Sequence, residues 1–167
     1  MDVQARCAAD SIEEVIRRYQ RMVFGLALSY TRSRADADDV FQEVFLLYYR
    51  EKVDFNSEEH RKAWLINATV NYSKKVTGST WRKKTGPLDE REESGYEFSS
   101  DDENLIYAAL LTLPQKYRVV LHLFYFQQMP IDEISKALRM KAGTVKVQLL
   151  RGRELMREKL KGDFLNA

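Results

Sequence analysis

Apolar residues recur every three or four positions over most of the chain, which is the spacing of one face of an α-helix. The first such pattern runs over residues 12–30. Ser11 and Glu14 stand before it at capping-box spacing, in which a serine side chain caps the helix N-terminus. A polar turn at 31–34 separates this helix from a second pattern that reaches about Arg50. We expect the two helices to pack as an antiparallel pair.

A third helical pattern begins near Ala63 and fades near Val76. Residues 51–59, which precede it, lose the apolar period and are expected to form a loop. Residues 85–101 are rich in Asp, Glu and Ser and poor in apolar residues, which favours a linker. We therefore predict an N-terminal helical domain over residues 1–84, followed by an acidic flexible linker.

Residues 102–167 again show helical patterns, which break at Pro114 and at the polar segment 127–130. A short helix is expected over 131–138 and a longer one over 143–160. No strand-like alternation or internal repeat stands out along the sequence. The predicted fold class is all-α, with two small helical domains joined by the linker.

The composition is typical of a soluble protein. Hydrophobic residues make up 44% of the 167 residues and charged residues 31%, without an apolar stretch long enough for membrane insertion. The single cysteine, Cys7, has no partner for an internal disulfide, and the first twenty residues lack the apolar core of a signal peptide. We expect a cytoplasmic location.

Positive and negative charges are segregated along the chain. Residues 60–84 carry seven Lys or Arg and no acid, residues 88–103 carry one Arg and eight acids, and residues 136–161 carry nine basic and two acidic residues. Two basic tracts separated by an acidic one suggest two polyanion-binding surfaces joined by a segment that does not bind DNA. Solvated helix faces would produce the same runs, so charge alone leaves both interpretations open.

The helices expected over 131–138 and 143–160 are joined by a turn of a few residues, as in a helix-turn-helix. Ser135 supplies a small side chain at the crossing, and Val145 supplies the apolar contact that closes the pair. Any αα-hairpin in a bundle would show this spacing, but the basic second helix favours DNA binding in the major groove. The candidate DNA-contacting residues here are Arg139, Lys141, Thr144, Lys146, Gln148, Arg151 and Arg153.

Different roles are expected within this set. Lys146 or Gln148 should contact bases, because they lie nearer the helix N-terminus, whereas Arg151 and Arg153 should contact phosphates. Arg139 occupies a turn position where glycine often adopts the left-handed conformation, and another residue there costs on the order of 1 kcal/mol.

Aromatic and basic residues interleave between positions 64 and 84, a combination that suits single-stranded DNA. Unstacked bases can lie on aromatic rings while the phosphate backbone meets positive charge. Trp64 falls on the apolar stripe of its helix, so we interpret it as a core residue. Tyr72 and Trp81 are the better candidates for exposed contacts.

Several runs of residues resemble a known family, the extracytoplasmic-function (group IV) sigma factors of the sigma-70 family. Those that resemble its sigma-4 domain are LPQKYR (113–118), IDEI (131–134), GTVK (143–146) and RGR (151–153). Those that resemble its sigma-2 domain are DADDVFQEVF (36–45), AWL (63–65), Asn71 and WRKK (81–84). Together the similar segments span about residues 11–160.

The resemblance implies a sigma factor, which is not an enzyme and needs no cofactor. Such a protein binds core RNA polymerase and recognises the minus-ten and minus-thirty-five elements of promoter DNA. The sigma-2-like domain would dock on polymerase and melt the minus-ten element, the helix-turn-helix would recognise the minus-thirty-five element, and the linker would lie in the RNA path. An anti-sigma factor is a further implied partner.

The resemblance also assigns residues to these tasks. The docking residues would be Asp36, Asp38, Asp39, Gln42 and Glu43. For the minus-ten element the resemblance assigns Asn71, Trp81, Arg82, Lys83 and Lys84, and the interleaving of aromatic and basic residues adds Tyr72, Lys74 and Lys75 as candidate contacts. Without the resemblance, the acids would also fit the solvated first turns of a helix, where negative charge interacts favourably with the helix dipole. Asn71 would likewise fit an ordinary surface amide. The acids lack nearby histidine or cysteine and an EF-hand spacing, which argues against a metal site.

The sequence departs from the family at several positions. Lys75 stands where many relatives have an acid, and Asn67 and Gly78 replace frequent arginines. Val147 and Gln148 follow Lys146, where serine and arginine are common. Base preferences are therefore not transferred from relatives to this chain.

Two other function classes share some of these features. A stand-alone helix-turn-helix regulator would bind operator DNA without polymerase, and an RNA-binding module would also present basic faces. The sequence gives little support for an enzyme. It has no glycine-rich phosphate-binding loop, and His60 and His122 are the only histidines that a Ser-His-Asp triad could use.

Overall fold

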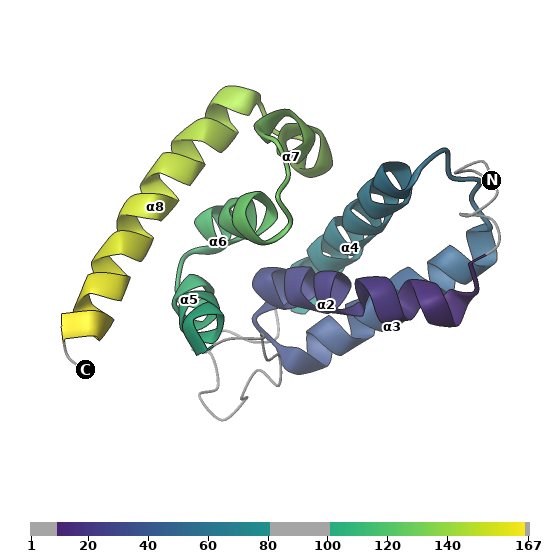
Figure 1. Cartoon of the computed structure of the whole chain (residues 1–167), viewed down its shortest axis with the longest axis horizontal. Helices are drawn as coiled ribbons and strands as arrows, with labels where there is room; N and C mark the ends of the chain where they lie inside the picture. The colour runs from purple at the N-terminus through teal and green to yellow at the C-terminus, as the bar shows by residue number, and fades with distance from the viewer. Residues whose placement is uncertain (1–9, 81–100, 166–167) are drawn as a thin grey trace. The chain divides into compact units, whose positions relative to one another are not determined.

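The structure is a computed structural model that describes residues 10–80 and 101–165. Every regular element in these two ranges is a helix, which confirms the all-α class. The chain divides into two compact units, Met1–Glu92 and Glu93–Ala167, each of which is described by itself. Most of the predicted linker lies outside the described residues, but its last residue, Asp101, begins a helix (Figure 1).

Within residues 10–80, the first unit has three helices that pack against one another, as Figure 1 shows. They are α2 (Ile12–Thr31), α3 (Arg34–Glu51) and α4 (Glu58–Thr80). The Oγ of Ser11 caps α2 by accepting a hydrogen bond of 3.3 Å from the Glu14 N–H, as the capping spacing predicted. Arg32 then adopts a positive φ of 53°, which ends α2 and lets α3 return alongside it.

The third helix begins earlier than its apolar pattern indicates, so the expected loop over 51–59 is shorter. Ser57 caps α4, because its Oγ accepts a hydrogen bond of 3.1 Å from the His60 N–H. Glu58 and Glu59 form the first turn, where negative charge suits the helix dipole. Because this turn is polar, the spacing of apolar residues did not indicate that it is helical.

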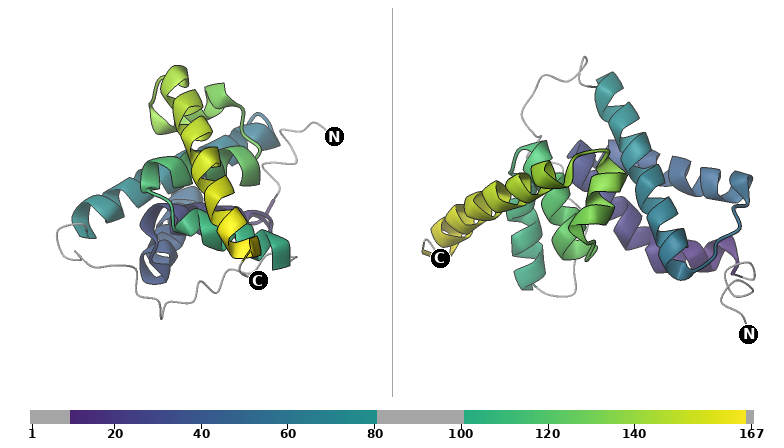
Figure 2. Two further views of the ribbon diagram at one scale, coloured as in Figure 1. Left: turned by 90° about the vertical axis from the view of Figure 1, so that its left-hand side faces the viewer. Right: turned by 90° about the horizontal axis from the view of Figure 1, so that it is seen from above.

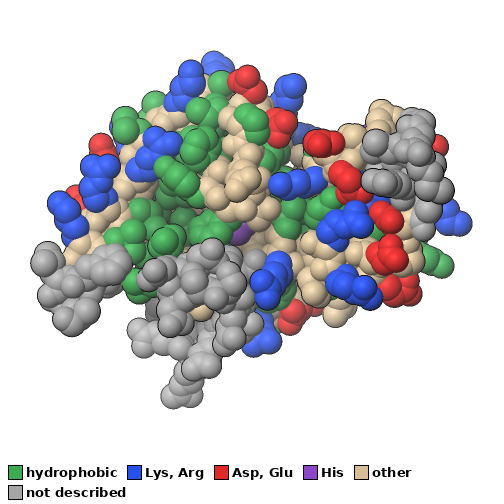
Figure 3. Space-filling view, in the orientation of Figure 1, with side chains coloured by type: hydrophobic (Ala, Val, Ile, Leu, Met, Phe, Trp, Pro, Cys, Tyr) green, Lys and Arg blue, Asp and Glu red, His purple; other side chains and the backbone are tan. Residues whose placement is uncertain are grey.

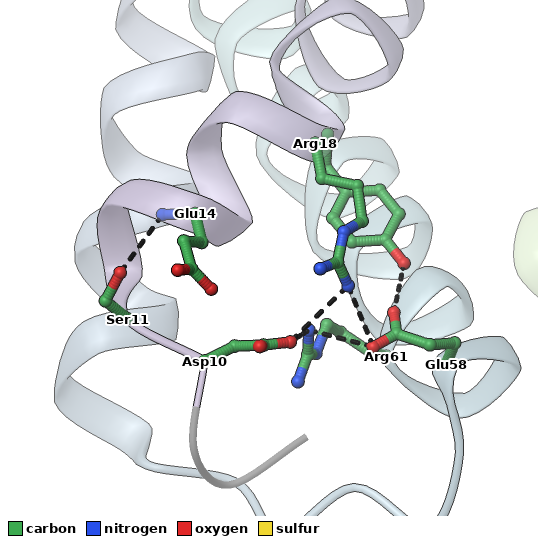
Figure 4. A network of polar contacts seen from close by, with 7 residues as sticks. Asp10, Ser11, Glu14, Arg18, Glu58 and Arg61 are labelled. Atoms are coloured by element: carbon green, nitrogen blue, oxygen red, sulfur yellow. Dashed lines mark hydrogen bonds and ion pairs between the residues drawn. The ribbon is translucent and has the colours of Figure 1, made fainter. Parts of the chain in front are cut away.

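A polar network ties the start of α4 to the start of α2 (Figure 4). The Arg61 side chain is 0% exposed, and its Nη1 lies 2.9 Å from Asp10 Oδ2 and 3.0 Å from Glu58 Oε1. Glu58 also accepts a hydrogen bond of 2.5 Å from the Tyr19 hydroxyl. Hydrogen bonding by Arg61 lowers the pKa of Asp10. The Arg61 charge is thus neutralised inside the unit and does not belong to the basic surface suggested by the count over residues 60–84.

Within residues 101–165, the second unit is built around its longest helix. Its elements are α5 (Asp101–Leu111), α6 (Gln115–Leu121), the π-helical η1 (His122–Phe126), α7 (Ile131–Leu138) and α8 (Ala142–Leu165). Figure 2 shows α8 extending past the other helices of this unit, and it packs on α5, α6 and α7. The break expected at Pro114 is confirmed, since α5 ends before it and α6 begins after it.

Gly152 allows α8 to approach α6 closely. A Cβ atom at this position would lie 2.8 Å from Leu121 Cδ1 and 3.3 Å from Tyr117 Cβ. Glycine in a helix interior costs roughly 1 kcal/mol relative to alanine. The close approach explains why glycine nevertheless stands between two arginines in the middle of α8.

Candidate nucleic-acid interface

The turn between α7 and α8 has the geometry expected for a helix-turn-helix. The Met140 N–H donates to the Ser135 carbonyl at 2.9 Å and the Arg139 N–H donates to the Lys136 carbonyl at 3.3 Å, which together form a Schellman ending. Arg139 has a φ of 54°, so the left-handed conformation expected there is present. The Ser135 hydroxyl donates to the Met140 carbonyl, which braces the same turn. Val145 is fully buried and closes the helix pair.

The basic side chains predicted on and before α8 face solvent. Those that are exposed are Arg139, Lys141, Thr144, Lys146, Arg151 and Arg153. In the space-filling view, blue Lys and Arg side chains follow the length of α8 (Figure 3). Gln148 differs, because it is half-buried and its Oε1 is a buried atom without a hydrogen-bond partner among the described residues. Of the two side chains predicted to contact bases, Lys146 is therefore the accessible one.

Two arginines of α8 are held by aromatic residues of neighbouring elements. The Nε of Arg153 donates a hydrogen bond of 2.6 Å to the Tyr125 hydroxyl oxygen, and its guanidinium lies 5.4 Å from the centroid of the Phe124 ring. Hydrogen bonding by Arg151 lowers the pKa of Tyr117. Residues two apart on a helix point in nearly opposite directions, so the two arginines border the exposed face of α8 from opposite sides.

The first unit carries the second basic surface on α4. Asn71, Lys74 and Lys75 are exposed, and their spacing places them on one face of the helix. Tyr72 is half-buried, and the Lys75 Nζ lies 5.7 Å from the centroid of its ring. The structure thus brings four of the predicted minus-ten residues together. Trp81, Arg82, Lys83 and Lys84 lie outside the described residues.

Trp64 belongs to an aromatic cluster inside the first unit. Its ring centroid lies 5.7 Å from that of Tyr48 and 6.1 Å from that of Phe55, both at near-perpendicular angles. Phe55 is buried although it lies in the loop before α4, and Trp64 itself is half-buried. These contacts agree with our interpretation of Trp64 as a core residue.

The acidic residues of α3 lie on the side of the helix that faces away from the core. Those exposed are Asp38, Asp39, Gln42 and Glu43, whereas Asp36 is half-buried. Val40 and Val44 are fully buried on the opposite side. Asp36 lies in the first turn, where its backbone N–H donates to the Ser33 cap.

Two exposed apolar residues on α3 were not predicted from the sequence as part of a binding surface. Leu46 is 53% exposed and Tyr49 is 61% exposed, and both follow Gln42 and Glu43 along the solvent-facing side. Their signal in the sequence is their position, since Leu46 directly follows Phe45 and Tyr49 directly follows Tyr48, so both fall outside the core stripe. A polar stripe that ends in a large aliphatic and an aromatic side chain is suited to a protein partner.

Neither a metal site nor a membrane span is found in the part of the chain that the structure describes. Residues 10–80 and 101–165 contain no cluster of three or more His, Cys, Asp or Glu side chains arranged to bind a metal ion. None of their helices combines the length and the apolar character that crossing a membrane requires.

Two family models match the chain, and each falls on one of the two units. Sigma-70 region 2 matches residues 15–83, and Sigma-70, region 4 matches residues 103–156. The first match spans the three helices of the first unit up to the basic segment after α4. The second spans α5 through most of α8.

Characterised relatives cover most of the chain. The ECF RNA polymerase sigma factor SigW of Bacillus subtilis is 25% identical over 171 residues, which cover 91% of this chain and 90% of that protein. The ECF RNA polymerase sigma-E factor of Escherichia coli K12 is 26% identical over 162 residues, which cover 87% and 84% of the two proteins.

Solved structures share the fold. The sigma factor RpoE from Bartonella quintana, crystallised with the anti-sigma factor NepR, has a TM-score of 0.70 at 19% identity, covering 89% of this chain and 96% of that one. CnrH in complex with the cytosolic domain of CnrY has a TM-score of 0.63 at 20% identity, covering 96% of each chain. The two sigma-70 matches cover the helices that carry the candidate sites, α3 and α4 in the first unit and α8 in the second. The chain belongs to the extracytoplasmic-function group of the sigma-70 family of RNA polymerase sigma factors.

Proposed function

We propose that this chain binds core RNA polymerase through the first unit and directs it to promoters by recognising two DNA elements, one with each unit. The observation that carries the proposal is the helix-turn-helix with an exposed basic face on α8. We assign residues 1–84 to polymerase docking and minus-ten melting, 85–101 to an acidic linker, and 102–167 to minus-thirty-five recognition.

Minus-thirty-five recognition rests on the second helix of the pair. An α-helix fits the major groove, where residues of its first turns reach base edges and later basic side chains hold phosphates. Lys146 is exposed in the second turn of α8 and reaches bases in this arrangement. Arg151 and Arg153 border the exposed face and contact the two sides of the groove.

Minus-ten recognition rests on the solvent face of α4. A melted promoter must be held open, which requires unstacked bases to be trapped and the backbone to be neutralised. The Asn71 amide donates and accepts hydrogen bonds and reads the edge of one such base. Lys74 and Lys75 hold the strand beside it, and the segment 81–84 continues the contact.

Polymerase docking rests on the exposed side of α3. Asp38, Asp39 and Glu43 meet basic groups of the partner, which orients the encounter. Leu46 and Tyr49 lose their solvent exposure on docking and supply the apolar core of the contact.

This proposal makes the chain a cytoplasmic, non-catalytic initiation factor. Two of the structural relatives are complexes with a second protein: CnrH with the cytosolic domain of CnrY, and the sigma factor RpoE with the anti-sigma factor NepR. We extend this to the present chain and propose that an anti-sigma factor holds it inactive by covering surfaces that polymerase or DNA needs. Neither a cofactor nor a metal takes part in these steps.

A pull-down with core polymerase separates this proposal from a stand-alone regulator. We expect the chain to bind core polymerase in the absence of DNA and to bind promoter duplex only weakly on its own. High affinity for one duplex sequence without polymerase, together with failure to bind core, would favour the regulator instead. The full-length sigma-factor relatives support the first outcome.

A further inference from the structure

Two large apolar side chains on α8 have no task in the proposed function as described so far. Val147 is 49% exposed and Leu150 is 57% exposed. Residues three apart on a helix lie on the same face, so the two side chains form one apolar surface. The core contacts of this part of α8 are made by Val145 and Leu149, which are 0% and 2% exposed. Val147 and Leu150 are therefore not needed to hold α8 in place.

We propose that Val147 and Leu150 form a specificity contact that reads the C5-methyl groups of thymines in the minus-thirty-five element. The inference rests on the proposed function, because it requires α8 to enter the major groove. It adds a determinant of sequence preference that the basic side chains of α8 do not provide.

The charges around the apolar pair point to DNA as its occupant. Residues 142–153 of α8 contain three basic residues and no acid, and the first acid of the helix is Glu154. Arg151 and Arg153 border the exposed face from opposite sides. The apolar pair thus lies between two cationic side chains. This arrangement fits a partner surface that has negative charge at its edges and apolar groups between them. A major groove has this arrangement where thymine methyl groups lie between its two phosphate backbones.

The chemistry of the groove selects the base. The thymine methyl is the apolar group that base pairs present in the major groove, and small aliphatic side chains pack against it. Val147 lies in the second turn of α8 and Leu150 in the third, within the part of a recognition helix that reaches base edges. Gln148 is half-buried, so its side chain would have to turn outward before it could contact a base. We therefore expect thymine in the element at one or two positions opposite the apolar pair.

Removing single methyl groups from the DNA tests the contact. A duplex library randomised over both promoter elements is first selected by transcription with this chain and core polymerase. Each thymine in the selected minus-thirty-five element is then replaced by deoxyuridine, which lacks only the methyl group, and holoenzyme affinity is measured. We expect about a fourfold loss at one or two thymines, which corresponds to the burial of one methyl group.

Protein variants identify the side chains that make the contact. Val147→Ala and Leu150→Ala should bind the thymine duplex more weakly and lose most of the discrimination between thymine and deoxyuridine. Ile106→Ala is the matched control, because Ile106 is a 39% exposed apolar residue on α5, outside the recognition helix. It should keep the wild-type ratio.

Each other outcome has a distinct meaning. Equal affinity for thymine and deoxyuridine at every position, with normal transcription, overturns the inference and leaves the proposed function intact. Discrimination that survives in both alanine variants also overturns it. If both variants keep DNA binding but lose binding to a protein such as an anti-sigma factor, the apolar pair is a protein-docking surface and the inference is wrong. Failure of the chain to support any transcription would instead contradict the proposed function.

Discussion

Arg153 on α8 and Tyr125 in η1 are joined by a hydrogen bond of 2.6 Å from the arginine Nε to the tyrosine hydroxyl oxygen. The same guanidinium lies 5.6 Å from the Tyr125 ring centroid and 5.4 Å from that of Phe124. A guanidinium fixed in this way through Nε keeps its two terminal nitrogens for a phosphate, and less side-chain freedom is lost when the phosphate binds. In the proposed function, the pair would therefore orient Arg153 for a phosphate contact before DNA binds.

Arg153→Ala should weaken binding to all promoters about equally. Losing one phosphate contact should also reduce the slope of log affinity against log salt by about 1. Tyr125→Phe removes only the hydroxyl and should produce a smaller loss with an unchanged salt slope. The measurement is a salt titration of holoenzyme affinity on several promoters. A changed order of preference among these promoters would mean that Arg153 contacts bases and that α8 is turned differently in the groove.

Reversing Asp38 and Asp39 to lysine should abolish binding to core polymerase while the chain stays folded. Both side chains are exposed, so reversal leaves the packing of α3 unchanged, but it places positive charge against the basic partner surface. Glu13→Lys with Glu59→Lys is the matched control, because both acids are exposed and lie in first helical turns of the same unit. Wild-type polymerase affinity of the Asp38/Asp39 variant, measured by pull-down with circular dichroism as a check of folding, would refute the docking assignment.

Asn71→Ala should leave stability and core binding intact but reduce promoter opening. Asn71 is exposed on α4, so its removal creates no cavity, and the loss should depend on which base occupies one minus-ten position. Permanganate footprinting and transcription on a minus-ten mutant series measure both effects. Equal opening by variant and wild type across the series would make Asn71 an ordinary surface amide.

His122 should make the second unit less stable in mild acid. The side chain is buried and its ring stacks on Phe126 with centroids 5.3 Å apart. Burial lowers the pKa of His122 from 6.5 to about 3. Between these values the unfolded chain binds a proton that the folded chain does not, so the free energy of unfolding falls as pH is lowered through this range and is fully present above it. The slope for one proton is at most about 1.4 kcal/mol per pH unit.

His122→Gln, which does not titrate, should remove this dependence. Hydrogen exchange of the amides of α6, corrected for intrinsic rates and compared between pH 5 and pH 7, measures it. Most carboxylates stay ionised over this interval, which isolates the histidine. An identical pH dependence in wild type and variant would show that folding does not lower the pKa of His122.

Helical periodicity was sufficient to predict the class and most of the helices, because each helix buries one face and that face repeats in the sequence. The start of α4 was missed because its first turn is stabilised by a serine cap and by polar partners. Arg61 was counted as a surface charge because one neutralising partner, Asp10, is distant in sequence and the other, Glu58, lies just before the window 60–84 in which charges were counted. Only the packing of α2 on α4 brings Arg61 and Asp10 together.

The candidate sites were predicted unevenly for a related reason. Composition and spacing indicated which helices carry charge, but not how each helix is rotated about its axis. Rotation places Gln148 partly inward and exposes Val147, and on α3 it exposes Leu46 and Tyr49. These rotations follow from packing against neighbouring helices, which a single sequence pattern does not contain.

Transcription in vitro tests the central proposal most directly. Core polymerase, this chain and a duplex library randomised over both promoter elements are combined, and the transcribed templates are sequenced. We predict transcripts that require the chain and templates that share two short elements at a fixed spacing. Absence of chain-dependent initiation, with one duplex sequence bound tightly by the chain alone, would contradict the account.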